Sequence, residues 1–312
     1  MIKKHTSLLI LPLYFFLKST TAYADLILIQ SWNMQWLSTK YTHLGPIRQE
    51  RDWLALRSIF HQSLADILFF QEVDSDNALR RIVPANYTLL FSDRALPSMH
   101  FHQFSDVNQY TGIALAPGIR FDNPPDLPLP ATKSKSTNYY SKLRWATYII
   151  VYPKNGTPIH LLSVHLKSGC TPSKTFRKTK ACRELRSQVA HLAGWIEQRA
   201  KQKQRFIIGG DFNYPLAKQG NPVWRQLSAS DPKNIILATK ELKTHCQVRS
   251  KRSAKRVVRH WHLLDHFITS SDITLDKTTQ RIYALDDIKR FQLSDHCPIE
   301  ARLMRDSPDV QR

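Results

Sequence analysis

Short apolar runs that alternate with longer amphipathic segments constrain the fold of this chain more than any other feature. Most of these runs have the length and composition of buried strands: 26–31, 67–73, 87–91, 112–116, 206–210, 263–269 and 298–303. Two segments, 47–64 and 182–203, instead place apolar residues at helical spacing. The runs 145–152 and 159–165 flank turn residues and predict a β-hairpin. Strands mixed with helices predict an α/β or α+β fold with a mixed sheet.

The composition is that of a folded globular chain. Of its 312 residues, 42% are apolar and 22% are charged, which excludes a disordered chain. The sequence has nine glycines and no repeat of fixed period, so it is neither collagen-like nor a solenoid. No Gly/Ser-rich linker divides it, and we therefore predict one domain over residues 25–312.

The N-terminus has the pattern of a secretory signal peptide. Lys3 and Lys4 precede the apolar run 8–17, and Ala22-Tyr23-Ala24 forms a small-residue cleavage site. The alternative is a membrane anchor, but this run is much shorter than the ~20 residues that span a bilayer. We predict a signal peptide over 1–24, cleaved after Ala24, and a secreted or periplasmic monomer without stable membrane insertion.

The cysteine count agrees with export. Four cysteines follow the predicted signal peptide: Cys170, Cys182, Cys246 and Cys297. An even number in an exported chain favours two disulfides, for which three pairings are possible. Cys170 with Cys182 closes the shortest loop and leaves Cys246 with Cys297. A zinc site is disfavoured because no Cys-x-x-Cys spacing occurs.

Polar residues that can bind or react stand at the ends of several strand-like runs. Singly, each is more often a turn former or a helix cap. Together they are harder to attribute to turns, because ligand sites in open α/β sheets gather at strand ends. The set is Asn33, Glu72, His165, Asp211, Asn213, Asp265, Asp295 and His296.

These residue types suit one reaction. Glu72, Asp211 and Asp295 offer hard carboxylate oxygens for Mg²⁺ or Mn²⁺, with Ca²⁺ as a further candidate. His165 and His296 can transfer protons near neutral pH, and a nearby carboxylate can orient a histidine. No serine or cysteine nucleophile is paired with a base in the sequence. The set predicts metal-assisted attack of water on a phosphate ester.

The motifs that hold these residues, in this order, resemble the endonuclease/exonuclease/phosphatase superfamily, and its deoxyribonuclease I type in particular. They are Ser31-Trp32-Asn33-Met34, Gln71-Glu72-Val73, Val164-His165-Leu166, Gly210-Asp211-Phe212-Asn213, Leu264-Asp265-His266 and Ser294-Asp295-His296. The resemblance covers the whole chain after the predicted signal peptide. It implies a four-layer sandwich of two packed mixed sheets flanked by helices, with the site at one edge.

The resemblance also implies a role for each motif residue. Glu72 corresponds to the main metal ligand with Asn33 beside it, Asp211 is a further candidate metal ligand, and Asp295 either contacts a metal or only shapes its loop. Asp211 and Asn213 correspond to the pair that orients the attacking water and holds the phosphate.

Two histidines complete the implied catalytic set. His296 corresponds to an acid/base catalyst oriented by Asp265, and His165 to the second catalytic histidine. The implied substrate contacts are Tyr110, Arg144, Lys167 and Asn213.

The chain departs from deoxyribonuclease I at two places. Gly112 stands where that enzyme has a glutamate that orients the second histidine, so this second dyad is in doubt. Asp74 stands where it has an arginine that reaches into the minor groove, so that mode of DNA contact does not transfer.

Positive charge is concentrated beside the catalytic motifs. The chain has a formal net charge of +20, and the basic loops 174–180 and 249–259 follow His165 and precede Asp265. Basic loops at the rim of a phosphodiesterase site would guide a polyanion to it. Trp261, just after the second loop, could stack on a base or lie under the loop. The alternative for both loops is an ordinary solvated surface.

Three functions remain open from the sequence. The favoured one is a secreted, metal-dependent nuclease acting on DNA or RNA with little sequence specificity, because phosphate contacts carry no base information. The second is a sphingomyelinase-like or inositol-phosphate phosphodiesterase or phosphatase, although we see no exposed aromatic hairpin or amphipathic helix for membrane binding. The third is a non-enzymatic binding protein, which the complete set of core polar residues disfavours.

Overall fold

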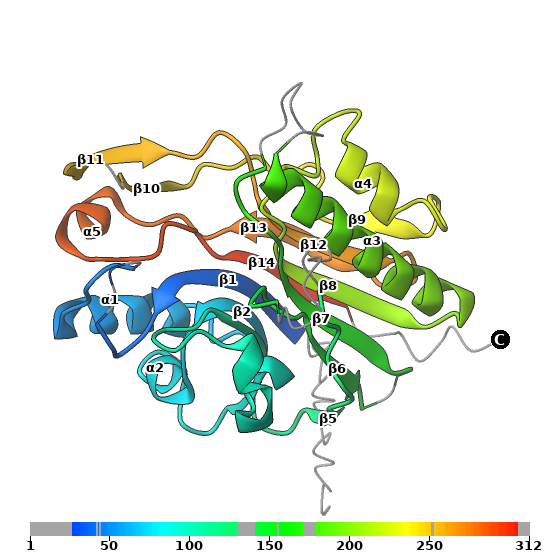
Figure 1. Cartoon of the computed structure of the whole chain (residues 1–312), viewed down its shortest axis with the longest axis horizontal. Helices are drawn as coiled ribbons and strands as arrows, with labels where there is room; N and C mark the ends of the chain where they lie inside the picture. Colours follow the sequence, from blue (N-terminus) through cyan, green and yellow to red (C-terminus); the bar gives the residue numbers. More distant parts are fainter. Residues whose placement is uncertain are drawn as a thin grey trace, which may run out of the picture.

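Two six-stranded mixed sheets form the centre of the molecule, as the computed structural model shows (Figure 1). The structure describes residues 27–41, 43, 45–129, 141–154, 156–170, 179–250 and 253–304. In the first sheet the strand order is β13 (Leu275–Gln280), β14 (Ile299–Leu303), β1 (Ile27–Leu37), β2 (Ile67–Val73), β4 (Tyr110–Leu115) and β3 (Thr88–Phe91). In the second sheet it is β5 (Arg120–Asp122), β6 (Thr147–Tyr152), β7 (Ile159–His165), β8 (Arg205–Asp211), β12 (Asp265–Ser270) and β9 (Ile235–Leu237).

Each sheet has one parallel pair at its centre. β1 pairs parallel with β2, and β7 pairs parallel with β8. The other pairings within the two sheets are antiparallel, including β8 with β12, where Asp211 lies opposite Asp265. Because the carboxyl ends of parallel neighbours meet at one sheet edge, this topology collects the ends of four strands.

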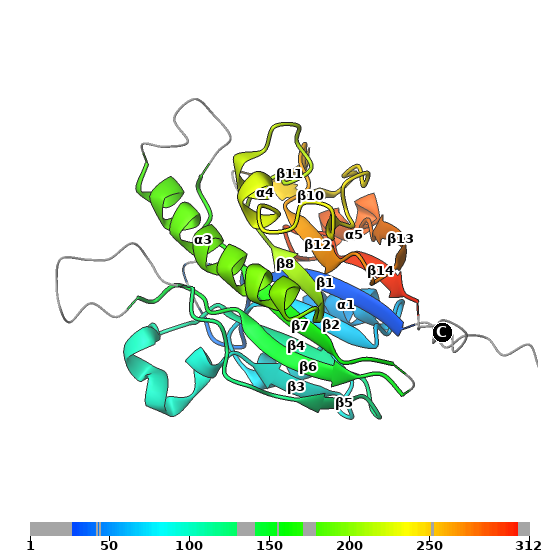
Figure 2. The same cartoon turned by 90° about the vertical axis from the view of Figure 1, so that its right-hand side faces the viewer.

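Helices cover the outer faces of the two sheets (Figure 2). α1 (Glu50–His61) buries Trp53, Leu56 and Phe60 against the first sheet, and α3 (Lys180–Lys201) covers the second. Shorter helices are α2 (Asp76–Arg80), α4 (Pro222–Leu227) and α5 (Leu285–Arg290). Two 3₁₀ helices, η1 (Asp93–Ala95) and η2 (Pro97–His102), lie between β3 and β4. The predicted four-layer sandwich is therefore confirmed.

The apolar stripe expected on the long helix is the surface that α3 buries. Leu185, Val189, Leu192 and Ile196 are fully buried against the second sheet. Burying each such side chain contributes about 1.5–3 kcal/mol. Between the sheets, Ile29, Phe69, Ile207 and Phe267 belong to a separate apolar core. Thr179 begins α3 by accepting a hydrogen bond from the Cys182 N–H at 3.2 Å.

The basic segment predicted as a loop over 249–259 is instead a two-stranded hairpin, which is a correction. β10 (Gln247–Ser250) pairs antiparallel with β11 (Ser253–Arg259), and the hairpin lies beside α5. Val248 is buried there, and Val257 and Val258 contact the same apolar core. This alternation of basic and apolar residues lets a charged segment form a strand pair with one face on the core.

Both disulfides have the pairing that was predicted from the shortest loop between two cysteines. Cys170 bonds to Cys182, and Cys246 bonds to Cys297. Two disulfides are compatible with an extracytoplasmic protein. The predicted signal peptide and the basic residues 174–178 lie outside the described residues. Within the described part of the chain, no helix is long and apolar enough to cross a membrane.

Candidate active site

The predicted site residues converge at the edge where the two parallel pairs end. Asn33 and Glu72 come from the carboxyl-terminal parts of β1 and β2, and His165 and Asp211 end β7 and β8. The strand register aligns His165 with Asp211 and Asp211 with Asp265. The cluster opens into a cleft of about 560 Å³. The predicted residues that line this cleft are Glu72, Arg144, His165, Asp211, Asn213, Asp295 and His296.

Unusual backbone conformations mark this edge. Glu72 and Asn213 have positive φ angles of 59° and 51°, and Gln35 and Trp36 have φ angles of 47° and 50°. Such left-handed conformations cost non-glycine residues about 1–3 kcal/mol and cluster at functional sites. Gln35 and Trp36 lie where the β1–β2 register shifts, between Asn33 and Leu37. β1 continues past the predicted run 26–31, and Asn33 therefore lies inside a strand.

Gly210 of the Gly-Asp-Phe-Asn motif is required by close backbone approach. Its φ angle is 152°, and a Cβ atom there would lie 2.0 Å from the Val164 carbonyl oxygen. Only glycine allows β7 and β8 to approach this closely. The motif thus places Asp211 directly after this close approach of β7 and β8.

Asn33 connects the two acidic residues of the cluster. Its side-chain amide donates to Glu72 Oε1 at 3.1 Å and to Asp211 Oδ2 at 3.0 Å. Its Oδ1 accepts a hydrogen bond from the Gln35 N–H at 3.0 Å. In this arrangement Asn33 acts as a donor that holds two carboxylates together, and its expected role as a metal ligand stays a prediction.

The oxygens of Glu72 and Asp211 form a donor set that suits a hard divalent cation. Glu72 Oε1 and Asp211 Oδ2 each lie 3.5 Å from His165 Nε2, so both carboxylates face the same point. The Trp36 N–H donates a hydrogen bond to Glu72 Oε2 at 3.1 Å. Carboxylate oxygens are the ligands preferred by Mg²⁺ and Mn²⁺. A second grouping, Asp211, Asp265 and His296, has ligand atoms within 4.8 Å of one another.

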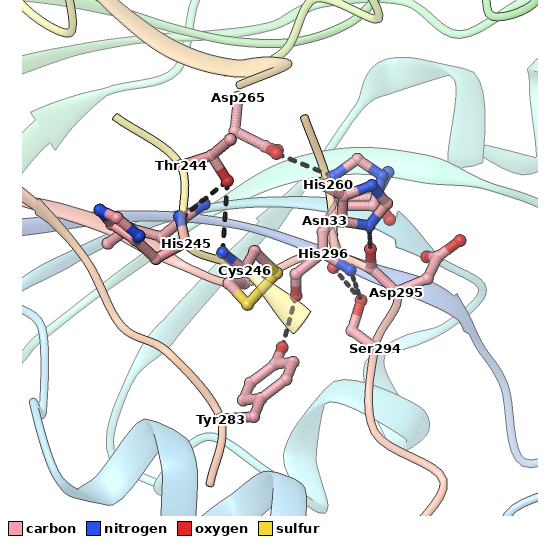
Figure 3. Close-up of a disulfide and its surroundings, with 12 residues drawn as sticks. Asn33, Thr244, His245, Cys246, His260, Asp265, Tyr283, Ser294, Asp295 and His296 are labelled. Carbon is pink, nitrogen blue, oxygen red and sulfur yellow. Dashed lines mark hydrogen bonds and ion pairs between the residues drawn. A yellow bond between two sulfur atoms is a disulfide. The ribbon is translucent and has the colours of Figure 1, made fainter. Parts of the chain in front are cut away.

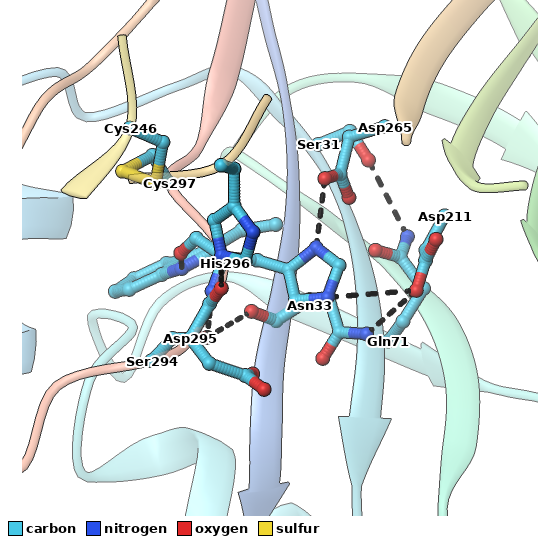
Figure 4. A network of polar contacts seen from close by, with 12 residues as sticks. Ser31, Asn33, Gln71, Asp211, Cys246, Asp265, Ser294, Asp295, His296 and Cys297 are labelled. Atoms are coloured by element: carbon cyan, nitrogen blue, oxygen red, sulfur yellow. Dashed lines mark hydrogen bonds and ion pairs between the residues drawn. A yellow bond between two sulfur atoms is a disulfide. The ribbon is translucent and has the colours of Figure 1, made fainter. Parts of the chain in front are cut away.

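His296 and Asp265 form a hydrogen-bonded dyad (Figure 4). His296 Nδ1 lies 2.8 Å from Asp265 Oδ2, and His296 Nε2 points toward Asp211 Oδ2 at 3.8 Å. Burial acts to lower the pKa of His296, but the carboxylates of Asp265 and Asp211 outweigh it and raise this pKa well above its usual value. The dyad therefore favours the protonated form of the imidazole and directs its Nε2 toward the cleft.

The loop that carries His296 is fixed on several sides. Ser294 Oγ donates to the Asn33 carbonyl at 2.6 Å and accepts from the His296 N–H at 3.1 Å. The Tyr283 hydroxyl donates to the His296 carbonyl. The disulfide from Cys297 to Cys246 ties the same loop to the start of the hairpin (Figure 3).

His165 is held differently. Its Nε2 faces Glu72 and Asp211, but no described residue hydrogen-bonds its buried Nδ1. Burial lowers the pKa of His165 well below its usual value, and the charges of Arg144 and His296 lower it further. Gly112 is the residue that stands at the place of the orienting glutamate of deoxyribonuclease I. Its position offers no room for a larger residue, because a Cβ there would lie 1.9 Å from the Phe70 ring and 2.5 Å from the Leu90 carbonyl oxygen.

Asp211 and Asn213 form a rigid turn at the end of β8. The Asn213 N–H donates to Asp211 Oδ1 at 2.7 Å, and the Asn213 side-chain amide donates to Asp211 Oδ2 at 3.0 Å. The same amide donates to the Leu166 carbonyl at 3.0 Å. Burial raises the pKa of Asp211 to about 7, although the nearby His296 acts to lower it.

The three other predicted substrate contacts differ in position. Arg144 lines the cleft and donates to the Leu166 carbonyl at 3.0 Å, and burial lowers its pKa. Tyr110 is buried beneath Arg94, whose Cζ lies 4.8 Å from the ring centre, and it is not among the described residues that line the cleft. Lys167 is not among them either, and its Nζ donates to the Ser168 carbonyl.

Several supporting residues were not predicted. Arg48 donates to the carbonyls of Met34, Gln35 and Trp36 and also to those of Gln292 and Leu293, which joins β1 to the His296 loop. Burial lowers the pKa of Arg48 to about 10. Its bonds go to backbone oxygens, which are present at every residue, so no sequence pattern indicated them.

Two side chains hold the backbone of Asp295 and were also not predicted. Gln35 Oε1 accepts from the Asp295 N–H at 3.0 Å. His260 Nε2 lies 2.8 Å from the Asp295 carbonyl oxygen, and its ring is 6.3 Å from that of His296 (Figure 3). His260 immediately follows β11, so the hairpin contacts the catalytic loop through this side chain as well as through the disulfide.

Solved structures with the same fold extend over nearly all of this chain. A Bacteroides vulgatus endonuclease/exonuclease/phosphatase superposes with a TM-score of 0.62 at 13% identity, covering 90% of this chain and 99% of its own. Truncated Caenorhabditis elegans TDP2 gives 0.57 at 18% identity, with 90% and 98% covered. The human Nocturnin catalytic domain with bound sulfate gives 0.57 at 18% identity, with 89% and 94% covered. At these identities the likeness shows the fold alone.

Sequence comparison defines the family. A search of curated proteins gave no significant match. The family model for the endonuclease/exonuclease/phosphatase family matches residues 31–296, which include Asn33, Glu72, Asp211 and His296. With this match over most of its length and the same fold, the chain belongs to the endonuclease/exonuclease/phosphatase family.

Proposed function

We propose that this chain is an exported, divalent-metal-dependent phosphodiesterase that hydrolyses nucleic acid with little sequence specificity. Members of its family are phosphoester hydrolases and are generally dependent on divalent metal. Export would follow removal of residues 1–24 after Ala24, leaving one domain over 25–312. The two disulfides are compatible with that location.

One observation carries the proposal. The Asp265–His296 dyad directs His296 Nε2 at the point where Asp211 and Asn213 meet, inside a cleft that Glu72 also lines. A scissile phosphate in this cleft would lie between an acid/base group on one side and acidic metal ligands on the other. Family membership supports phosphoester chemistry in this cleft, and the geometry supplies a group for each part of it.

The residues of the cleft would have different roles in the reaction, which follow from their positions. Asp211, fixed by the Asn213 turn, would orient the attacking water, and the Asn213 amide would hold a phosphate oxygen in exchange for its present acceptor, the Leu166 carbonyl. His296, oriented through Nδ1 by Asp265, would hold or move a proton at Nε2. Arg144 in the cleft wall would contact the phosphate. A cation held by Glu72, with Asp211, Asn33 or Asp295, would neutralise negative charge on the phosphate oxygens.

Charge favours a polyanionic substrate. The formal net charge is +20, and such an excess acts on partners and association rates more than on the fold. On the hairpin Arg256 is exposed, whereas Arg249 donates to the Ile288 and Lys289 carbonyls at the end of α5. Arg249 therefore supports the hairpin, and only part of this basic segment is available to phosphates.

A second candidate is a phosphodiesterase acting on lipid head groups. The structure contains a hairpin that the sequence did not indicate, and Trp261, two residues past β11, is 83% exposed. This corrects the expectation that no exposed aromatic accompanies a hairpin. Exposed aromatic residues beside basic ones also occur at membrane interfaces, so this observation favours the alternative.

A substrate panel tests both candidates. The purified exported protein is incubated with plasmid, RNA, sphingomyelin vesicles and an inositol phosphate, each with Mg²⁺ and with EDTA. We expect Mg²⁺-dependent hydrolysis of plasmid or RNA, a ~10²–10⁴-fold loss in His296→Ala, and none in His191→Ala, an exposed histidine on α3. Glu72→Gln should shift the Mg²⁺ titration to higher concentration. Hydrolysis of lipid alone would support the second candidate, and an unchanged Mg²⁺ titration in Glu72→Gln would remove its assignment as ligand.

A further inference from the structure

Trp261 is the most exposed large hydrophobic residue in the described part of the chain. Its exposed fraction is 83%, against 64% for Ile47, the next in rank. It lies in the segment that runs from the hairpin to β12 (Figure 1). At this exposure it does not lie under the hairpin. At this exposure the indole offers a large apolar surface to a partner, whereas tryptophan normally buries most of that surface.

The surroundings of Trp261 define a groove of about 400 Å³, which we call the Trp261 groove. Its apolar lining comes from Pro215, Ala217, Leu242 and Leu263, and its charged lining is cationic. No carboxylate is among its described lining residues. The cationic side chains are Lys218, Lys243 and Arg259, with His262 beside them.

The Trp261 groove adjoins the catalytic cluster. Thr244, His262 and Leu263 also line a smaller cavity whose other walls include Asp265 and His296. In addition, His260, the neighbour of Trp261, contacts the Asp295 carbonyl at 2.8 Å. The groove therefore lies on the His296 side of the catalytic cluster.

We propose that the Trp261 groove is a subsite for a nucleic acid strand that continues beyond the scissile phosphate. The indole would stack on an unpaired base, and Lys218, Lys243 and Arg259 would contact phosphates. Stacking on an aromatic ring combined with a positively charged groove is how proteins bind single strands without sequence preference. This inference rests on the proposed nuclease function and specifies its substrate as single-stranded or locally unpaired.

The shape of the surface favours nucleic acid over a membrane. Trp261 lines a recess, and its apolar neighbours Leu242 and Leu263 are half-buried and buried. A membrane-binding surface instead presents several apolar side chains on one projecting face. A recess with one exposed ring and three cations matches a base and its flanking phosphates.

The test compares Trp261→Ala with Trp261→Phe, which keeps a stacking face, and with Leu54→Ala, a 53% exposed residue on α1. Binding of a fluorescent single-stranded oligonucleotide is measured by anisotropy in EDTA. We expect Trp261→Ala to bind about tenfold more weakly, in line with the removal of one base stack, while the other two variants bind nearly as the parent does. Turnover of bis(p-nitrophenyl) phosphate, which is too small to reach the groove, should be unchanged in all three.

A second pair of variants tests the charges. Lys218→Ala with Lys243→Ala should flatten the plot of log affinity against log salt by about 0.7 units for each single-strand phosphate that is no longer neutralised. If Trp261→Ala binds the oligonucleotide like the parent, the subsite is wrong even though the nuclease function stands. The subsite is also wrong if Trp261→Ala loses binding only to anionic vesicles. Failure of the parent to cleave any nucleic acid would instead overturn the proposed function.

Discussion

The two histidines of the cleft both direct Nε2 toward Asp211 Oδ2, but they are supported very differently. His296 has a carboxylate on Nδ1, hydrogen bonds to its backbone, and a disulfide at the next residue. His165 is the last residue of β7, a central strand of the second sheet, and its Nδ1 has no described partner. The first is positioned by side chains from several elements, and the second by its strand and by the Glu72 and Asp211 carboxylates that face its Nε2.

The different surroundings of the two histidines shift their pKa values in opposite directions. On the His296 side, nearby carboxylates raise the pKa of the ring well above its usual value, whereas burial lowers that of His165. Groups whose environments push their pKa values apart are suited to different proton-transfer roles. We infer that His296 is the principal acid/base group and that His165 mainly contributes its Nε2 to the Glu72–Asp211 cluster.

The largest expected effect compares the two histidines directly. His296→Ala should reduce turnover of a small phosphodiester by ~10²–10⁴-fold, and Asp265→Asn by somewhat less, because a positioned proton-transfer group contributes on this order. His165→Gln, which can still place a donor near Glu72, should lose about tenfold to a hundredfold. Turnover at saturating substrate and Mg²⁺, with thermal melts to verify folding, measures this. An equal or greater loss in His165→Gln would reverse the assignment.

The two disulfides extend the comparison to stability. Cys246–Cys297 spans 51 residues and Cys170–Cys182 spans 12, so loop-closure entropy gives about 4 and about 3 kcal/mol respectively. Serine pairs at each bridge should therefore show similar losses in the free energy of unfolding, measured by denaturant titration. Only the Cys246/Cys297 pair should also lower turnover, since Cys297 adjoins His296. Equal turnover in both pairs would show that the His296 loop does not need this tether.

The candidate site residues could be brought together from the sequence because most of them stand at or near strand ends, and strand ends meet at one edge. The residues that support them could not. Arg48 and His260 act on backbone carbonyls, and Tyr283 on the carbonyl of His296, so no pairing of residue types signals these contacts. β13 was missed because it is an edge strand whose residues are all exposed or half-buried, so its sequence is polar and lacks apolar alternation.

Gly112 offers a way to test whether the His165 side can be made like the His296 side. Gly112→Glu would place a carboxylate where deoxyribonuclease I has one, but its Cβ would meet the Phe70 ring and the Leu90 carbonyl. We expect a loss of about 1–3 kcal/mol in unfolding free energy from overpacking and no gain in turnover. Gly194→Ala on α3 provides a control for glycine replacement, because its Cβ would meet no atom within 4 Å. A stable, faster Gly112→Glu variant would show that the site lacks only this carboxylate.

The smallest expected effect concerns the hairpin that the disulfide joins to the His296 side. Arg249 and Arg256 lie on its two strands, but Arg249 donates to carbonyls at the end of α5 while Arg256 is exposed. Arg256→Ala should flatten the slope of log affinity for duplex DNA against log salt by about 0.9 units if this side chain meets one phosphate. Arg249→Ala should leave that slope unchanged and instead lower stability by about 1 kcal/mol or more, because it removes charge-assisted hydrogen bonds. Each variant removes one positive charge, so the net charge of the protein cannot explain a difference between them. If both variants flattened the slope of log affinity against log salt equally, the hairpin would act only through its total charge. The contacts of Arg249 with α5 would then not limit the access of Arg249 to phosphate.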